Sequence, residues 1–373
     1  MAKIISVEPI VLEAPIGEPV LRARQTVPIT ARRAMLVKIT TDNGLYGVGE
    51  GLSPVAPRVA ATIVRDVFTP FLLGQNPLNT ETIWEKLYGT MSSRGYSRGF
   101  QMVAISAVDI ALWDLKGKIL NQPIYRLLGG ACSNPIPVYT TGLMLREKDE
   151  LAALAKKYLA DGFRAMKLKI GESVKKDIEN IATLREVLGD SVKLMVDANG
   201  GYDPSTAIQL GQMMSPYQIT WFEEPVRPEN IRGSAEVARI LDIPIAAGEC
   251  EYTKYGFREI FLQHAVDIIQ PDVARAGGIT ECKKIAALAQ AFNIPYAPHA
   301  WGGAVCIAAT LHLAASLPNF LICEFDRVPN PLRDELLVEP LRYRDSYLFL
   351  PEKPGLGIEL NKDALEKYRM QEK

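Results

Sequence analysis

From about residue 136 to residue 325, short apolar runs alternate with longer amphipathic stretches. The runs have the length of buried strands, and in the stretches between them apolar residues recur every three or four positions, as in helices. The strand-like runs are residues 137–142, 165–170, 193–197, 220–224, 243–249, 266–272, 294–299 and 321–325. The helical stretches are residues 148–161, 174–188, 204–214, 231–241, 255–263, 280–292 and 303–317. Eight consecutive strand–helix units of about 25 residues each predict a (β/α)₈ barrel. An open, doubly wound sheet accounts less well for eight such units in succession.

The first part of the chain has strands before helices. Asp42, Asn43 and Gly44 form a strong hairpin signal between two β-rich runs. The predicted strands are residues 3–12, 34–40 and 45–50, and the predicted helices are residues 57–73, 79–91 and 100–120. This order predicts an α+β module. We therefore expect this module at residues 1–130, the barrel at residues 131–340, and a tail at residues 341–373 that leaves the barrel and packs on the N-terminal module.

Composition narrows the class of protein. Of the 373 residues, 48% are hydrophobic and 23% are charged, which is ordinary for a globular protein. With a net charge of −1, the chain has no excess positive charge that would attract nucleic acid or an anionic membrane, so we expect neither partner. The N-terminal residues lack the apolar core of a signal peptide, and the most apolar long stretch, residues 302–317, is too short to span a bilayer.

The five cysteines are scattered, odd in number and without CxxC spacing. They fit reduced thiols and a cytoplasmic location better than a disulfide framework or a zinc site. The three histidines, His264, His299 and His312, can be weighed one by one. We expect His312, on a predicted helix, to be a satisfied core residue.

Ionisable side chains stand at the ends of seven consecutive predicted strands. Chance predicts roughly two or three, because about a quarter of residues are charged. In a (β/α)₈ barrel the catalytic residues lie at these carboxyl ends. In strand order the groups are Lys167 with Lys169, Asp197, Glu223 with Glu224, Glu249, Asp272, His299, and Glu324 with Asp326.

Three of these acids, Asp197, Glu223 and Glu249, are separated by equal intervals of 26 residues. Equal spacing places the carboxylates at one height on adjacent strands, which lie about 4.8 Å apart. Three unpaired carboxylates that close repel one another, and a hard cation relieves the repulsion. Oxygen ligands suit Mg²⁺, so we favour a magnesium site over three separate salt bridges.

Lys167 and Lys169 are two residues apart in one predicted strand, so both side chains face the same way. If they face inward, each ammonium group disfavours the charge of the other. One lysine pKa should then fall from about 10.4 toward neutrality, which yields an amine base. A solvated strand edge is the alternative interpretation of this motif taken alone.

Asp272 and His299 end neighbouring predicted strands. An aspartate beside a histidine fixes the imidazole tautomer and raises its basicity, so the two form a candidate proton-transfer dyad. The lysines precede the three acids around the barrel and the dyad follows them. A substrate held over the cation would therefore have an amine on one face and an imidazole on the other. Coordination of the substrate carboxylate would stabilise the enediolate formed by removal of the α-proton.

The chain resembles the mandelate racemase branch of the enolase superfamily over nearly its whole length. The segments that carry the resemblance are KLK at 167–169, VDANG at 196–200, WFEEP at 221–225, AGE at 247–249, QPD at 270–272 and PHAWG at 298–302. A lysine or histidine base combined with Mg²⁺ is the known arrangement of enolase-superfamily sites. The resemblance implies a (β/α)₈-type barrel and an N-terminal α+β capping domain, completed by the C-terminal tail, that closes over the barrel mouth.

The resemblance also implies roles for individual residues. It implies Mg²⁺, with Mn²⁺ as a possible substitute, on Asp197, Glu223 and Glu249. It implies Lys169 as one base and His299 with Asp272 as the other. By the same analogy Lys167 and Glu324 touch the substrate carboxylate, and Asn199 lies within its reach.

Residues 15–33 contain Gly17, Pro19 and Pro28 together with four arginines. This composition predicts a mobile loop over the barrel mouth. Arg22 or Arg24 could bind a distal carboxylate of the substrate. A solvated basic loop is an equally good interpretation.

Two enzymatic functions fit these residues. The segments at 323–327, 330–333 and 354–360 resemble those of acid-sugar enzymes. This resemblance favours a lyase or cycloisomerase that works by β-elimination on an acid sugar or its lactone. The alternative is a racemase or epimerase of a 2-substituted carboxylic acid that uses the same two bases. A non-catalytic binding protein is a third reading, but a retired site would be expected to lose at least one of these groups. The expected partners are a small-molecule carboxylate and, by analogy alone, further copies of the chain in a homo-oligomer.

Overall fold

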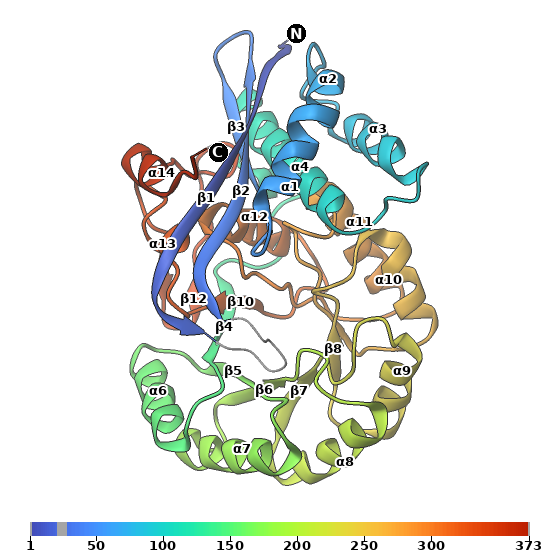
Figure 1. Ribbon diagram of the computed structural model, residues 1–373, viewed down its shortest axis with the longest axis vertical. Helices are drawn as coiled ribbons and strands as arrows, with labels where there is room; N and C mark the ends of the chain where they lie inside the picture. The colour runs from blue at the N-terminus through green and yellow to red at the C-terminus, as the bar shows by residue number, and fades with distance from the viewer. Residues whose placement is uncertain (1, 21–27, 372–373) are drawn as a thin grey trace.

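The computed structural model describes residues 2–20 and 28–371. It has two parts along its long axis: a three-stranded sheet with helices at the top of Figure 1, and a ring of strands surrounded by helices below. No helix in the described part of the chain is long and apolar enough to cross a membrane.

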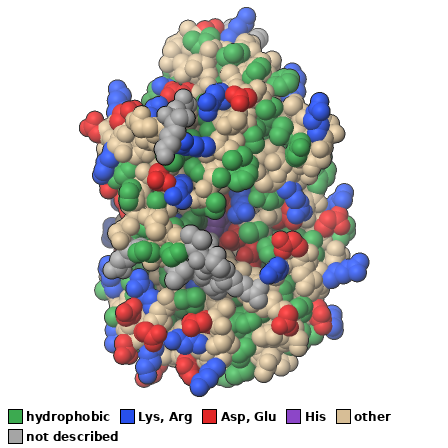
Figure 2. All heavy atoms as spheres, in the orientation of Figure 1, with side chains coloured by type: hydrophobic (Ala, Val, Ile, Leu, Met, Phe, Trp, Pro, Cys, Tyr) green, Lys and Arg blue, Asp and Glu red, His purple; other side chains and the backbone are tan. Residues whose placement is uncertain are grey.

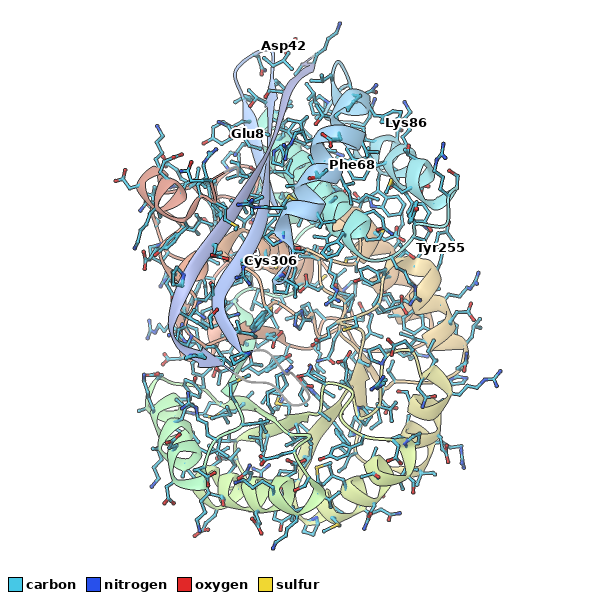
Figure 3. The ribbon with its side chains drawn as sticks, in the orientation of Figure 1. Glu8, Asp42, Phe68, Lys86, Tyr255 and Cys306 are labelled. Atoms are coloured by element: carbon cyan, nitrogen blue, oxygen red, sulfur yellow. The ribbon has the colours of Figure 1, made fainter. Side chains whose placement is uncertain are left out.

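The upper part is built on strands β1 (Ile4–Val20), β2 (Ile29–Thr41) and β3 (Tyr46–Gly51), which pair antiparallel in that order. Its helices are α1 (Pro57–Thr62), the π-helical η1 (Ile63–Phe68), α2 (Thr69–Leu72), α3 (Thr80–Ser92) and α4 (Phe100–Ile119). The helices pack one apolar face on the sheet, and Phe68 lies fully buried in the core they share (Figure 3). The predicted α+β order is confirmed.

The prediction of a mobile loop over residues 15–33 is wrong for residues 15–20 and 29–33, which are strand. Pro15 pairs with Ala31, and Val20 pairs with Ile29. Prolines indicated a loop, but β1 is an edge strand, where a missing N–H is tolerated. Arg22 and Arg24 lie outside the described residues.

The lower part is the predicted (β/α)₈-type barrel. Its strands are β4 (Ile136–Leu143), β5 (Ala165–Lys169), β6 (Lys193–Asp197), β7 (Ile219–Glu223), β8 (Ile245–Ala247), β9 (Ile268–Ile269) and β10 (Cys323–Asp326). They pair in parallel, and β10 returns to pair with β4. The outer helices are α6 (Lys148–Ala160), α7 (Val174–Leu188), α8 (Pro204–Met214), α9 (Ile231–Ile240), α10 (Thr253–Leu262), α11 (Gly278–Ala291) and α12 (Ala304–Ala315). Short helices α5 (Ile124–Leu127), η2 (Ser215–Tyr217) and α13 (Pro331–Asp334) lie between these elements.

The seventh barrel segment differs from its prediction. Residues 294–299 were expected to form a full strand, but only single bridges form there, from Tyr296 to Ile269 and Phe320 and from His299 to Asp272. Pro295 and Pro298 lack the N–H groups that a continuous ladder needs. The segment still keeps its place in the ring, so His299 lies beside Asp272.

An apolar floor fills the barrel interior. Each barrel segment contributes one member of this buried cluster, which consists of Tyr139, Ala165, Met195, Trp221, Ala246, Ile268, Ala297 and Ile322. Side chains two residues apart in a strand share a face. Seven of the eight positions two residues further on are buried polar groups, namely Thr141, Lys167, Asp197, Glu223, Gln270, His299 and Glu324. The eighth is Gly248. A polar ring therefore stands directly on the apolar floor.

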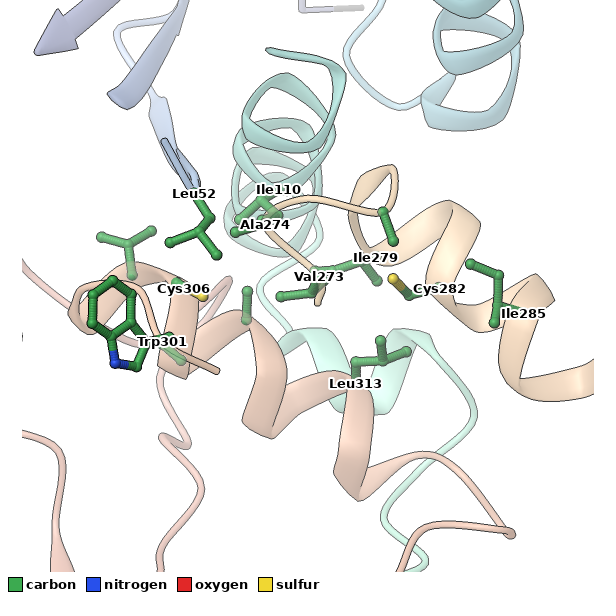
Figure 4. Packing of buried hydrophobic residues seen from close by; sticks show 14 of the residues in the cluster. Leu52, Ile110, Val273, Ala274, Ile279, Cys282, Ile285, Trp301, Cys306 and Leu313 are labelled. Atoms are coloured by element: carbon green, nitrogen blue, oxygen red, sulfur yellow. The ribbon is translucent and has the colours of Figure 1, made fainter. Parts of the chain in front are cut away.

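Two buried carboxylates join the upper part to the barrel. Glu50 of β3 accepts hydrogen bonds from the backbone N–H of Gly303 at 2.6 Å and of Cys306 at 2.9 Å, at the N-terminus of α12. Asp109 of α4 does the same for α11 through the backbone N–H of Thr280, at 2.9 Å. Helix N-termini favour negative charge. Around them Leu52 of the upper part packs with Ala274, Trp301 and Cys306 of the barrel (Figure 4).

The tail runs from the barrel back to the upper part. Strands β11 (Tyr343–Arg344) and β12 (Tyr347–Leu348) form a hairpin on β4, and helix α14 (Lys362–Tyr368) lies beside β1. The backbone N–H of Leu356 donates to Asp114 Oδ1 of α4 at 2.8 Å, and that of Met370 donates to the carbonyl of Val11 at 2.9 Å. The tail thus ties the two parts together.

His312 sits where α12, α5 and the tail meet. Its Nε2 lies 3.1 Å from the Leu356 carbonyl, its Nδ1 lies 3.4 Å from the Tyr125 N–H, and its ring stacks on that of Tyr125. Nε2 therefore donates and Nδ1 accepts, which requires a neutral ring. Burial lowers the pKa of His312 to about 4.

Acid should therefore destabilise the protein through His312. The unfolded chain, with a histidine pKa of about 6.5, takes up a proton that the folded chain refuses until the pH approaches 4. This stabilisation is complete above pH 6.5 and is lost as the pH falls. We expect His312→Gln to reduce the loss of unfolding free energy between neutral pH and pH 4 by up to about 3 kcal/mol, measured by urea unfolding. The exposed His264→Gln variant is the control, and identical pH profiles for His312→Gln and the unmodified chain would contradict the account.

Candidate active site

The three equally spaced acids converge at the barrel mouth. Asp197 ends β6 and Glu223 ends β7, and the two residues pair directly across the strands. Glu249 follows β8 after Gly248, whose φ of +134° turns the chain there. Carboxylate oxygens of the three residues lie within 4.8 Å of one another, and all three side chains are buried. The structure thus brings the predicted trio together.

Two lysines from β5 neutralise part of this charge. Lys167 Nζ contacts Glu223 Oε1 at 2.5 Å, Asp197 Oδ2 at 3.3 Å and Glu324 Oε1 at 3.5 Å. Lys169 pairs with Asp197 and donates to Asn199 Oδ1 at 2.9 Å. Both lysines therefore face into the barrel, and the solvated-edge interpretation of the motif is wrong.

The electrostatics show that Lys167 is not the lysine with the lowered pKa. Burial lowers the pKa of Lys167, but the nearby carboxylates of Glu223 and Glu324 outweigh it and hold that pKa well above its usual range. The proximity of two ammonium groups was expected to depress a lysine pKa, and at Lys167 the carboxylates prevail. Burial and the charge of Asp197 raise the pKa of Glu223 to about 8. Although burial opposes it, Lys169 and Lys167 keep the pKa of Asp197 below its usual value.

The Asp272–His299 pair forms as predicted. Their backbones bridge, and His299 Nδ1 lies 2.6 Å from Asp272 Oδ2. The other ring nitrogen, Nε2, lies 3.5 Å from Glu249 Oε2 and 3.8 Å from Glu324 Oε2. Burial lowers the pKa of His299, but these carboxylates and Asp272 raise it overall, to about 9. Asp272 thus orients the ring so that Nε2 faces the acids.

The remaining predicted residues divide into two groups. Glu324 lies between Lys167 and His299 and accepts a hydrogen bond from the Ala300 N–H at 2.9 Å. Asn199 lies next to Lys169, as described above. Both therefore line the same site, while the placement of Arg22 and Arg24 is outside the described residues. In the space-filling view a histidine lies in a hollow between the two parts of the molecule, beside acidic side chains (Figure 2).

Several residues of the site were not singled out from the sequence. Gln270 donates to Glu223 Oε2 at 2.6 Å, and Trp221 Nε1 donates to the same oxygen at 3.1 Å. Gln270 lies two residues before Asp272 and so shares its face, a signal that could have found it.

Arg32 is buried, pairs with Asp326 Oδ2 at 2.5 Å and lies over the Trp301 ring. It fixes β2 to the end of β10, so Asp326 serves docking of the upper part.

The backbone is strained where the chain leaves β6 and β7. Asn199 has a φ of +44° and Glu224 a φ of +38°, and residues other than glycine adopt such positive values uncommonly. Such strain persists only where the surrounding structure imposes it, and it clusters at functional sites. Here the positive φ values accompany turns that bring Asn199 beside Lys169 and Glu224 beside Glu249.

Two family descriptions match the chain. "Mandelate racemase / muconate lactonizing enzyme, N-terminal domain" covers residues 6–129, and "Enolase C-terminal domain-like" covers residues 150–364. The chain belongs to the mandelate racemase and muconate lactonizing enzyme family of the enolase superfamily. Together the two matches span both parts of the fold.

Relatives and solved structures agree with this membership. The chain is 41% identical to a D-galactarolactone cycloisomerase of Agrobacterium fabrum over 91% of this chain and 92% of the relative. It is 36% identical to an arabinonate dehydratase of Saccharolobus solfataricus over 89% of each. A racemase from Streptomyces coelicolor, crystallised with bound magnesium, superposes with a TM-score of 0.91 at 31% identity, over 98% of this chain and 100% of that chain. The chain is accordingly an enzyme, a lyase or an isomerase.

Removal of Lys167 should destabilise the metal-free protein. Lys167→Met leaves Glu223 and Glu324 buried without their main cation, and breaking a buried pair in this way costs about 3–5 kcal/mol. We expect that loss in urea unfolding of chelator-treated protein. Lys353→Met removes an ion pair whose side chains are 70% and 80% exposed, so it should change little. Equal stability of the two variants would contradict the assigned contacts.

Proposed function

We propose that the enzyme removes the proton α to the carboxylate of an acid sugar or its lactone and then eliminates the β-oxygen, as a dehydratase or a cycloisomerase. One observation carries the proposal: two candidate bases lie at opposite ends of the row of three acids. Lys169 of β5 pairs with Asp197, and His299, held by Asp272, faces Glu249. The names of the relatives, a galactarolactone cycloisomerase and an arabinonate dehydratase, support the substrate class.

The acids fit Mg²⁺ as donors. Asp197, Glu223 and Glu249 offer only oxygen atoms, which hard cations prefer, and their mutual repulsion favours a cation between them. The magnesium in the Streptomyces coelicolor racemase supports the same choice, and Mn²⁺ is a plausible substitute. When bound, the ion would stabilise negative charge that develops on the substrate carboxylate.

The chain's own groups divide the proton transfers between them. One of Lys169 and His299 accepts the α-proton as the C–H bond breaks, and the other donates a proton to the leaving oxygen as the C–O bond breaks. Asp272 holds His299 in the tautomer that presents Nε2 to the substrate. Lys167 and Glu324, which contact each other beside the three acids, are proposed to bind the substrate carboxylate and position it.

Racemisation or epimerisation of a 2-substituted acid is the second candidate. It requires the same two bases on opposite faces of the α-carbon, and the Streptomyces coelicolor racemase shares the fold. Incubation of galactarolactone, arabinonate and other acid sugars with Mg²⁺ in D₂O, followed by NMR, separates the two. A 2-keto or rearranged product supports elimination. Deuterium at the α-carbon of an otherwise unchanged substrate supports racemisation, and no exchange or product with any carboxylate contradicts both.

Each base should be separable by isotope exchange. We expect Lys169→Met and His299→Asn each to lower kcat by about 10²–10⁴-fold, the usual contribution of a general acid or base. The variant that keeps the α-proton acceptor should still exchange deuterium into the substrate without forming product. Lys175→Met, an exposed change on α7, should retain full activity. Near-normal turnover in both base variants would contradict the assigned roles.

Metal binding should stabilise the protein through the acids. At an Mg²⁺ concentration of 100 times Kd the stabilisation is about 2.7 kcal/mol, so the melting temperature should rise. Asp197→Asn removes one ligand and should abolish most of that rise, while exposed Glu352→Gln should keep it. An undiminished rise in Asp197→Asn would show that the ion binds elsewhere.

We also infer a cytoplasmic location and a homo-oligomer. The five cysteines, all described by the structure, are free thiols, as in a reducing compartment. The homo-oligomer rests on analogy with barrels of this branch, and light scattering during size-exclusion chromatography measures it directly.

A further inference from the structure

A second group of ligand-type atoms lies beside the candidate magnesium site. A carboxylate oxygen from each of Glu224 and Glu249 and the sulfur of Cys250 lie within 4.8 Å of one another. Glu224 and Glu249 are buried, and Cys250 is half-buried. Glu249 belongs to both groups. The two groups therefore share one carboxylate.

Glu224 is the unusual member of this group. Its side chain is only 4% exposed, yet it makes no hydrogen bond or ion pair with any residue that the structure describes. Burial and the charge of Glu249 raise the pKa of this carboxyl well above its usual range, and a buried acid without a partner either keeps its proton or binds a metal. The positive φ of Glu224 holds it just beyond β7, so that its carboxylate meets Glu249 and Cys250. The backbone thus keeps an unpartnered carboxylate aimed at a thiol and a second carboxylate.

The surroundings leave room for further ligands. A cavity of about 30 Å³ lies between the ends of β7 and β8 and helices α9 and α10, and Glu224, Gly248 and Cys250 are among its lining residues. One water needs about 10–15 Å³ of such space, so at least one water could complete a coordination shell. Burial and the charges of Glu249 and Glu224 raise the pKa of the Cys250 thiol, and the nearby Arg275 guanidinium opposes them. Arg275 Nε itself donates to Tyr252 Oη at 3.1 Å.

We propose that Glu224, Glu249 and Cys250 form a second cation site that selects a thiophilic divalent ion such as Zn²⁺ or Cd²⁺. Thiolate sulfur is a soft ligand that Zn²⁺ accepts and Mg²⁺ avoids, so this group and the three-acid group prefer different ions. In a tetrahedral zinc site, ligand atoms are roughly 3.5 Å apart. Binding would draw these three atoms together from their present separations of at most 4.8 Å. Binding displaces the thiol proton into solvent as the metal–sulfur bond forms.

The shared carboxylate couples the two sites. A thiophilic ion that holds Glu249 withdraws one ligand from the three-acid site, so the ions should compete. Zinc or cadmium would then inhibit the enzyme without contacting the substrate. The existence of the site does not depend on which reaction the enzyme performs, because the ligands are assigned from geometry alone.

The test is a titration of the full-length protein with Cd²⁺, without substrate, followed by the ultraviolet charge-transfer band of a cadmium–thiolate bond. We expect a saturating band that Cys132→Ser, a change at an exposed thiol, retains and that Cys250→Ser loses. Glu224→Gln should weaken cadmium binding by roughly tenfold or more. Added Mg²⁺ should weaken it in the unmodified chain through Glu249.

Three results would overturn the proposal. One is a band that survives in Cys250→Ser, which would place the ion on another thiol. Another is unchanged affinity in Glu224→Gln, which would remove the buried carboxylate from the site. The last is cadmium binding that ignores Mg²⁺, which would show that Glu249 is not shared. A normal Mg²⁺-dependent rise in melting temperature for Cys250→Ser would show that this variant is folded.

Discussion

The site depends on the repulsion among three carboxylates that the barrel holds within 4.8 Å of one another, away from water. Every neighbouring group responds to that charge. Lys167 and Lys169 lie against the acids, the pKa of Glu223 rises to about 8, and the pKa of His299 rises to about 9 because Glu249 and Glu324 face its ring. A divalent cation among the acids would relieve the repulsion and release the lysines from that role.

The scaffold keeps the acids in place against this repulsion. The apolar floor of the barrel fixes the side chains beneath them, and Gln270 and Trp221 both donate to Glu223. Further out, Glu50 and Asp109 from the upper part cap two barrel helices, and Arg32 ties β2 to the end of β10. The proposed substrate would therefore bind at a barrel mouth whose side chains are already held in place.

Much of this could be predicted from the sequence, because period and spacing report directly on strands. Equal intervals of 26 residues indicated that Asp197, Glu223 and Glu249 would converge, and strand order placed Asp272 beside His299. What failed depends on tertiary context. Prolines in β1 suggested a loop because the pairing with β2 could not be known. Which of the two lysines keeps a raised pKa could not be predicted, because Glu324, 157 residues away along the chain, supplies part of the negative charge around Lys167. The sequence did not distinguish the role of Glu224 from that of its neighbour Glu223, because the positive φ that turns Glu224 toward Cys250 is visible only in the structure.

The most direct test of this account is the anomalous diffraction of Mn²⁺ in crystals of the protein. The account predicts one strong peak about 2 Å from an oxygen of each of Asp197, Glu223 and Glu249, with Lys167 and Lys169 moved off the carboxylates. A peak held by other residues, or none while both lysines remain paired with Asp197, would contradict it.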